Sequence, residues 1–320
     1  MTELNPAQQL VAAGLLDLRS FTPKVGAAEV EDLTRRFNAQ QQWAVDALHQ
    51  AGQTLWVNKN TIATVLGCET RWRDGDNFAW TVANSIGTIT HRAAESMLVG
   101  RHAGPPANAV DGAIRSLVDE NTSFAEFYDA AEGADHAALR AGALGHVTSI
   151  VDGFPPLPRR VLPRTEQTFS HAISGRTIEL RARPDLALGR PSGPDARSLL
   201  LDLKTGQPHQ SHADDLRFYA LVFTLRWGAA PWRVASYYAA DGTWVAEDVD
   251  IDVLDAAARR VADAVGKITE MNVSDRPPGL SPGPMCRWCA LKETCEGAKA
   301  YEHASIGESD DLGFGDDDAF

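Results

Sequence analysis

Two neighbouring stretches decide the fold, RTIELRARPDLAL (residues 176–188) and SLLLDLK (residues 198–204). Both alternate apolar and polar residues with the period of two that is typical of a half-buried β-strand. In the second stretch, Asp202 and Lys204 lie on the same side of the strand. In the first, we expect one continuous strand with a core face and a charged face. The residues of that core face are Ile178, Leu180, Ala182, Leu186 and Leu188.

Apolar periodicity predicts both strands and helices around these two stretches. Ser174 and Gly175 predict a turn that leads from an earlier strand into the first stretch. We expect further strands over 162–172, 232–239 and 243–249. We expect helices over 61–66, 85–99, 212–227 and 251–271, and alanine-rich helices across 108–150. The order of elements predicts an α/β protein with a mixed central sheet flanked by helices and a helical N-terminal part.

Charge is unevenly distributed along the 320 residues, whose formal net charge is −13. The segment 302–320 carries seven acidic residues and neither lysine nor arginine, and its composition predicts a disordered tail. The segment 157–190 holds seven arginines against three acidic residues. The acidic total argues against a protein that coats nucleic acid nonspecifically, but a locally basic groove remains compatible with it.

Membrane and export signals are not expected in this chain. No apolar run reaches the ~18–20 residues that a membrane span needs, and Met1–Pro6 shows no basic segment ahead of an apolar one. We therefore expect a cytoplasmic protein with no membrane partner. Clustered thiols in that compartment bind metal or carry out redox chemistry more often than they form disulfides.

The residues that carry chemistry are Asp185, Asp202 and Lys204, which two neighbouring strands present together. Two convergent carboxylates form an oxygen site suited to Mg²⁺ or Mn²⁺. A lysine beside such a site can orient a metal-bound water or neutralise developing charge, and such a site hydrolyses phosphodiesters. The alternative is two acids at strand ends and a surface lysine.

This arrangement resembles the signature of the PD-(D/E)XK nuclease superfamily, whose fold is restriction-endonuclease-like. Gly87, His91 and Glu95 resemble the helix motif of its RecB-like branch, and Tyr219 lies where that branch has Gln-x-x-x-Tyr. The single upstream cysteine and the later triplet resemble the iron–sulfur site of AddB-type nuclease domains and of CRISPR-associated RecB-like exonucleases. The four motifs follow the family's order from Cys68 to Cys295.

The resemblance implies a role for each matching residue. Asp185 and Asp202 would ligate the catalytic metal, with the Leu203 carbonyl as a further ligand and His91 as an imidazole ligand. Lys204 would handle the nucleophilic water. Two further residues complete the implied site: Glu166 as an acidic residue on the preceding strand, and Tyr219 as a contact to DNA or a support for the site.

Asp215 departs from the family pattern, because it stands where the branch has glutamine, four residues before Tyr219. A helix places both side chains on one face, so Asp215 is expected to point at the site. A carboxylate cannot donate the hydrogen bonds of an amide, and it could repel phosphate or recruit a second metal. Arg181 and Arg183 share the face of Asp185 and are expected to form ion pairs or to contact phosphate.

The four cysteines, Cys68, Cys286, Cys289 and Cys295, are the number that one four-thiolate site needs. Zn²⁺ and a [4Fe–4S] cluster both accept such a set. Zinc sites usually show two close pairs, whereas here Cys68 stands alone, and the resemblance favours the cluster. The alternative is four unrelated buried thiols. Either metal group would close a long loop and contribute to stability.

These observations predict a division into four parts: an N-terminal helical part (1–84), a nuclease core (85–275) with a helical insertion (108–150), a cysteine-rich metal cap (276–303) and the tail (304–320). The predicted activity is metal-dependent hydrolysis of DNA, as an exonuclease on single-stranded or end-containing DNA. The tail ends in an acidic run and Phe320, and could bind other DNA-processing proteins. The rival hypotheses are a non-catalytic DNA-binding or adaptor protein that keeps the fold, and a zinc-stapled structural domain.

Overall fold

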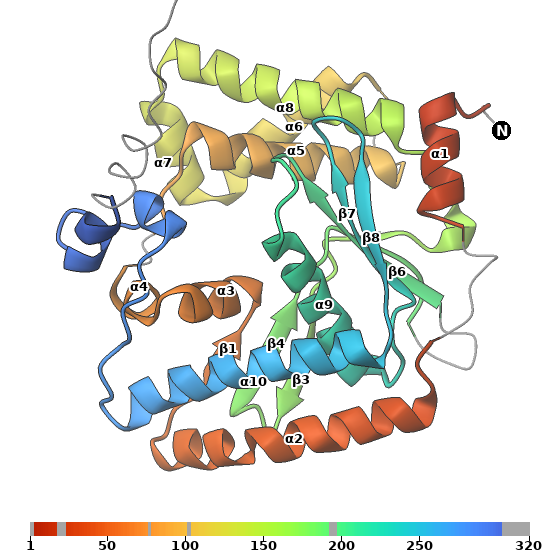
Figure 1. Cartoon of the computed structure of the whole chain (residues 1–320). Helices are drawn as coiled ribbons and strands as arrows, with labels where there is room; N and C mark the ends of the chain where they lie inside the picture. The colour runs from red at the N-terminus through yellow and green to blue at the C-terminus, as the bar shows by residue number, and fades with distance from the viewer. Residues whose placement is uncertain (1–2, 18–23, 76–77, 101–103, 192–196, 303–320) are drawn as a thin grey trace, which may run out of the picture.

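The computed structural model describes residues 3–17, 24–75, 78–100, 104–191 and 197–302, and its strands form two sheets (Figure 1). The larger sheet has the order β2–β5–β6–β7–β8, and only β6 and β7 are parallel neighbours. Its strands are β2 (Arg164–Thr165), β5 (Leu186–Arg190), β6 (Arg197–Lys204), β7 (Arg233–Tyr238) and β8 (Trp244–Asp248). The predicted mixed α/β fold is therefore confirmed.

The smaller sheet has the order β1–β4–β3 and was predicted to be part of one central sheet. Its strands are β1 (Leu55–Val57), β3 (Phe169–Ile173) and β4 (Ile178–Ala182), with β1 parallel to β4 and β3 antiparallel to it. The sequence did not predict β1, which has only three residues. The expected strand over 162–172 is also divided, because its first part forms β2 and the rest enters β3.

The prediction of one continuous strand over 176–188 is wrong. β4 ends at Ala182 and β5 begins at Leu186, and the two strands lie in different sheets. Pro184 explains the break, because proline has no N–H to donate to a ladder and restricts the residue before it. The chain therefore leaves the small sheet, presents Asp185 at the crossing point, and enters the large sheet.

Three long helices cover the sheets on one side (Figure 1). They are α2 (Ala27–Gln50), α9 (Ser211–Trp227) and α10 (Ile251–Val273). Helix α9 packs against β3, β4, β6 and β7, and α10 packs across α9 and α2. Together with the small sheet they enclose the largest apolar core, in which α9 is buried on most of its surface. The expected helices over 212–227 and 251–271 correspond to α9 and α10.

A helical bundle lies on the other side of the large sheet (Figure 1). It contains α5 (Val82–Leu98), α6 (Pro106–Glu120), α7 (Thr122–Ala130) and α8 (Gly133–Gly153). The inserted helices share one apolar core with α5, which includes Ile89, Phe124 and Val147. The short N-terminal helix α1 (Pro6–Gly14) packs against α8. The expected helices over 85–99 and 108–150 therefore form a single packed unit.

Short helices connect the remaining segments: α3 (Lys59–Gly67), α4 (Glu69–Asp74), and the 3-10 helices η1 (Arg159–Val161) and η2 (Pro284–Trp288). Helix α3 begins at Lys59, before the expected start at residue 61, because Asn58 caps it. The Asn58 side chain accepts a hydrogen bond from Thr61 N at 2.9 Å. The expected acidic tail, 304–320, lies outside the described residues. Among the described helices, none is long and apolar enough to cross a membrane.

Candidate active site

An open groove of about 1180 Å³ lies between the α5 bundle and the two sheets. Asp185, Asp202, Lys204 and His91 all line it. The antiparallel pairing of β5 with β6, in which Leu186 opposes Leu201, brings the start of β5 beside the end of β6. This register places Asp185 next to the carboxyl end of β6, where Asp202 and Lys204 lie.

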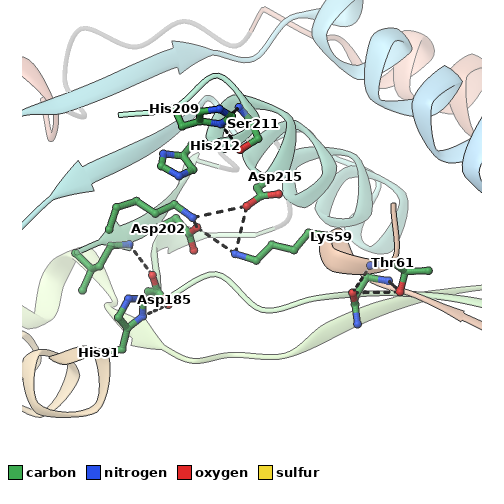
Figure 2. A network of polar contacts seen from close by, with 12 residues as sticks. Lys59, Thr61, His91, Asp185, Asp202, His209, Ser211, His212 and Asp215 are labelled. Atoms are coloured by element: carbon green, nitrogen blue, oxygen red, sulfur yellow. Dashed lines mark hydrogen bonds and ion pairs between the residues drawn. The ribbon is translucent and has the colours of Figure 1, made fainter. Parts of the chain in front are cut away.

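Asp185 is held by hydrogen bonds at both of its carboxylate oxygens (Figure 2). Oδ2 accepts from Leu203 N at 2.5 Å, and Oδ1 lies 2.9 Å from His91 Nδ1. Burial, followed by the charge of Asp202, raises the pKa of Asp185. Burial alone would lower the pKa of His91, but the charge and hydrogen bond of Asp185 outweigh it, so the pKa of His91 is raised.

Glu166 completes a group of three possible metal ligands with His91 and Asp185. One ligand atom from each residue lies within 4.8 Å of the other two. Glu166 N donates to the Asp185 carbonyl at 3.1 Å, and Arg183 Nε lies 2.8 Å from Glu166 Oε2. Burial and the nearby Asp185 charge raise the pKa of Glu166. Two carboxylates and an imidazole are ligands that suit Mg²⁺ or Mn²⁺, so the donor set fits the expected ion.

Asp202 lies apart from this group because two lysines hold it. Its carboxylate is 2 % exposed, and Oδ2 lies 2.6 Å from Lys204 Nζ and 3.2 Å from Lys59 Nζ. Burial opposes ionisation, but the charges of Lys59 and Lys204 outweigh it and lower the pKa of Asp202 to about 2. The carboxylate is therefore ionised and balanced by two ammonium groups.

The sequence did not predict Lys59. It lies 143 positions before Asp202, outside every motif that the resemblance contains. Only the fold brings the two together, because β1 pairs with β4 and carries the start of α3 to the groove. The one local pattern at Lys59 is a lysine directly after an asparagine that caps a helix. That pattern predicts no catalytic or binding role.

Tyr219 and Asp215 extend from α9 toward the two lysines. Asp215 Oδ2 lies 3.6 Å from Lys59 Nζ and 3.6 Å from Lys204 Nζ, as Figure 2 shows for the labelled Lys59 and Asp215. The Lys59 ammonium lies 5.2 Å from the centre of the Tyr219 ring. Burial and the charge of Asp202 raise the pKa of Tyr219, so the phenol stays protonated. Tyr219 lines the groove, and Asp215 contacts it through the two lysines.

Arg181 and Arg183, for which ion pairs or phosphate contacts were expected, both form ion pairs. Arg183 pairs with Glu166, and Arg181 Nε lies 3.2 Å from Glu179 Oε1. The Arg181 guanidinium also stacks 3.6 Å above the exposed Trp56 ring. Phe78 lines the same groove and is 70 % exposed. An exposed aromatic ring and a guanidinium lying on an indole are both surfaces on which a nucleobase can stack.

The four cysteines line a second cavity, which adjoins the groove at Asn60 and Phe78. Cys68 directly follows α3. Cys286 lies in η2, and Cys289 and Cys295 follow it; the blue segment that holds η2 lies beside α4 (Figure 1). All four thiols are free and partly buried.

Zn²⁺ and a [4Fe–4S] cluster both accept four thiolates, so the shared cavity of the four cysteines is compatible with either metal group.

Glu69 joins the Cys68 segment to the segment that leads to the triplet. Its side chain is 7 % exposed and lies 2.8 Å from Arg276 Nη1, 3.0 Å from Lys267 Nζ and 2.6 Å from Gly279 N. The Arg276 hydrogen bond, supported by Gly279 N–H and Lys267, lowers the pKa of Glu69 to about 2 against the effect of burial. This buried network orients the two cysteine-bearing segments toward each other.

The fold and the groove define a class of proteins, the metal-dependent nucleases. A mixed sheet presents two carboxylates and a lysine at neighbouring strand ends, beside an imidazole from a flanking helix. The family model described as the PD-(D/E)XK nuclease superfamily matches residues 60–296. The chain belongs to this superfamily, and its membership implies a metal-dependent nuclease that acts on DNA.

Two further comparisons complete these findings. The chain is similar to a solved structure titled "Crystal structure of SSO0001", with 14% sequence identity and a TM-score of 0.34. That similarity covers 66% of this chain and 95% of the other. A search of curated proteins found no match.

Proposed function

We propose that this protein is a deoxyribonuclease that removes nucleotides from DNA ends, with two carboxylates and a lysine as its catalytic groups. The observation that carries the proposal is the convergence of Asp185, Asp202, Lys204 and His91 in one open groove. Each of these groups comes from a different position in the fold, and no packing requirement explains a buried pair of carboxylates.

The residues present would hold Mg²⁺ or Mn²⁺ through Asp185, Asp202 and His91, with Glu166 and the Leu203 carbonyl as further ligands. The bound cation polarises a phosphoryl oxygen and lowers the pKa of a coordinated water. Leu203 N–H holds Asp185 Oδ2 in place, and Oδ1 lies beside the His91 imidazole, so the two groups that would bind the ion are already adjacent. Lys204 lies on the same face as Asp202 and would orient the attacking water.

Exonuclease action on single strands follows from the resemblance to the RecB-like branch and from the groove's stacking surfaces. The Tyr219 ring packs against the Lys59 ammonium, and the exposed Phe78 ring lines the groove. A single strand presents free base faces to such a ring, whereas a duplex hides them. We therefore propose single-stranded or end-containing DNA as the substrate.

A [4Fe–4S] cluster bound by Cys68, Cys286, Cys289 and Cys295 is the second cofactor that we propose. The cavity that the four cysteines share and the resemblance of their spacing in the sequence to the iron–sulfur site of AddB-type nuclease domains support this proposal. Iron and sulfide analysis of anaerobically purified protein tests this assignment, together with visible absorbance. Stoichiometric zinc without iron would exclude the cluster.

A nuclease assay tests the catalytic proposal directly. DNA labelled at the 5′ or the 3′ end is incubated with Mn²⁺ and either wild-type protein or Lys204→Ala. We expect progressive release of labelled nucleotides by the wild type, and a loss of at least about 100-fold in the variant. Binding of DNA by the wild type without cleavage would instead support the non-catalytic adaptor, for which Asp215 in place of glutamine is the one favourable observation.

A further inference from the structure

A second lysine reaches the site from outside the nuclease motifs. Lys59 is the first residue of α3, and its side chain is 25 % exposed. Its ammonium lies 3.2 Å from Asp202 Oδ2, 3.6 Å from Asp215 Oδ2 and 5.2 Å from the Tyr219 ring centre. Three partners on two other elements therefore hold a lysine that the matched family segment, 60–296, does not include.

Lys59 belongs to a balanced set of four charges. Lys204 contacts the same two carboxylates, at 2.6 Å from Asp202 and 3.6 Å from Asp215. Two partly buried ammonium groups thus face two carboxylates, of which Asp202 is almost fully buried. Removal of one member leaves a charge without its counterpart, which is costly in a partly buried site.

Asp215 distinguishes this set of charges from the family pattern, which has glutamine at the corresponding position. At this position an amide would donate hydrogen bonds to a substrate, whereas a carboxylate repels a phosphate. The Lys59 ammonium donates to Asp202 Oδ2 at 3.2 Å and is hydrogen-bonded to Tyr219, whereas Asp215 Oδ2 at 3.6 Å acts on it through charge. Lys59 also lines the groove, so its positive charge faces the space in which a phosphate would lie.

We propose that Lys59 and Asp215 act as one unit that replaces the amide. In this unit Asp215 anchors the Lys59 ammonium, and Lys59 neutralises Asp215 and positions a DNA phosphate beside Asp202. The inference rests on the proposed nuclease function and assigns Lys59 as a positioning residue. Figure 2 shows the geometry behind it, with the Lys59 ammonium between Asp202 and Asp215.

The charge balance makes opposite predictions for the two single substitutions. Lys59→Met leaves the set with one excess negative charge beside the phosphate, and Asp215→Gln leaves one excess positive charge. The double substitution restores neutrality with an amide at position 215. Recovery of binding in the double variant would show that the charge balance of the set, and not the Lys59 side chain alone, determines the affinity.

The experiment measures binding of a fluorescent single-stranded oligonucleotide by anisotropy in EDTA, and kcat and KM in Mn²⁺. We expect Lys59→Met to weaken binding roughly tenfold, and Asp215→Gln to tighten it. The double variant should return to within about threefold of wild type, and the salt dependence of binding should fall by about one unit of slope in Lys59→Met. Lys59→Arg should keep most of the affinity because it keeps the charge.

Lys24→Met is the matched control, because Lys24 forms a comparable pair with Asp248 at 3.3 Å and does not line the groove. The inference is overturned if Lys59→Met binds and cleaves like wild type, or if the double variant binds as weakly as Lys59→Met. If Lys59→Met does not fold, as judged by circular dichroism, Lys59→Arg and Asp215→Gln alone decide: unchanged affinity in Asp215→Gln then overturns it. A wild-type protein that neither binds nor cleaves DNA would instead refute the proposed function itself, and the inference with it.

Discussion

Asp185 Oδ2 accepts a hydrogen bond from Leu203 N at 2.5 Å, although Asp185 lies just before β5 and Leu203 lies in β6. The backbone N–H of Leu203 in β6 therefore donates to a side chain that lies just before the start of β5. The fold needs an acceptor at this position, and the proposed chemistry needs a negative charge there. A substitution can separate these two requirements.

Asp185→Asn keeps an acceptor for Leu203 N–H and removes the charge. Because burial and Asp202 raise the pKa of Asp185, its charged form is disfavoured in the folded protein at neutral pH. In EDTA we therefore expect the variant to be at least as stable as wild type, with a gain of up to about 1 kcal/mol or 2–4 °C in Tm. Mn²⁺ should raise the Tm of the wild type alone, as measured by differential scanning calorimetry. An equal Mn²⁺ shift in the variant would contradict a ligand role for Asp185.

His91 should make metal binding depend on pH. Although burial opposes it, Asp185 raises the pKa of His91 above its ordinary value of 6.5, so in the absence of metal the imidazole keeps its proton to a higher pH than a free histidine does. A metal ligand must be neutral imidazole, so binding must release that proton. We expect the affinity for Mn²⁺ to rise by up to about tenfold per pH unit until the pH exceeds this raised pKa.

Isothermal titration in two buffers of different ionisation enthalpy measures the proton released by His91. His91→Asn is the matched comparison, because asparagine keeps a polar side chain without titrating. The variant should bind Mn²⁺ more weakly and with a flat profile over the same range. A wild-type protein that binds Mn²⁺ with no proton release would rule out His91 as the titrating ligand.

The stability that Glu69 contributes should depend on pH. Its pKa in the folded protein, about 2, is lower than the ordinary value of 4.5, so its contribution is complete above about pH 4.5 and is lost as pH falls toward 2. We expect Glu69→Gln to lower the free energy of unfolding by about 2–3 kcal/mol at pH 7. Urea denaturation at pH 7 and at pH 3 measures this, and the gap between the two proteins should narrow at the lower pH.

Asp32→Asn is the control for Glu69, because Asp32 forms exposed ion pairs with Arg35 and Arg36 on α2. Such surface pairs contribute little. A loss in Asp32→Asn as large as in Glu69→Gln would mean that charge alone, and not the buried network, determines the effect. Susceptibility of 277–284 to proteolysis gives a second measure, because Glu69 binds Gly279 N directly.

The sequence predicted the parts of the site that local pattern controls. Asp202 and Lys204 lie on one side of a strand because the strand has a period of two, and the chain order of the motifs placed Asp185 before them. The break at Pro184 was missed because apolar alternation continues across it, although proline cannot take part in a ladder. Periodicity alone therefore joined two strands that belong to different sheets.

Lys59 and Glu69 show what could not be predicted. Each forms its important contacts with residues far along the chain, at Asp202 for Lys59 and at Arg276 for Glu69. Both are charged residues at the start of short helices, where sequence alone predicts a solvated side chain. Their burial depends on how β1 and the cysteine-bearing segment dock, which is tertiary information.

Phe78 should matter for single-stranded DNA and for little else. Its ring is 70 % exposed and contacts Trp80 edge to face at 4.9 Å, so Phe78→Ala should leave Tm almost unchanged. Stacking of a base on an aromatic ring contributes about 1–3 kcal/mol, so we expect roughly tenfold weaker binding of single strands. Duplex binding should not change, because bases in a duplex already stack on each other.

Anisotropy titrations with single-stranded and duplex DNA measure this difference. Trp43→Ala on α2 is the control, because it removes an exposed aromatic ring away from the groove. Equal affinity of wild type and Phe78→Ala for single strands would exclude the ring as a stacking surface, whereas equal losses for both substrates would point to a general disturbance of the groove.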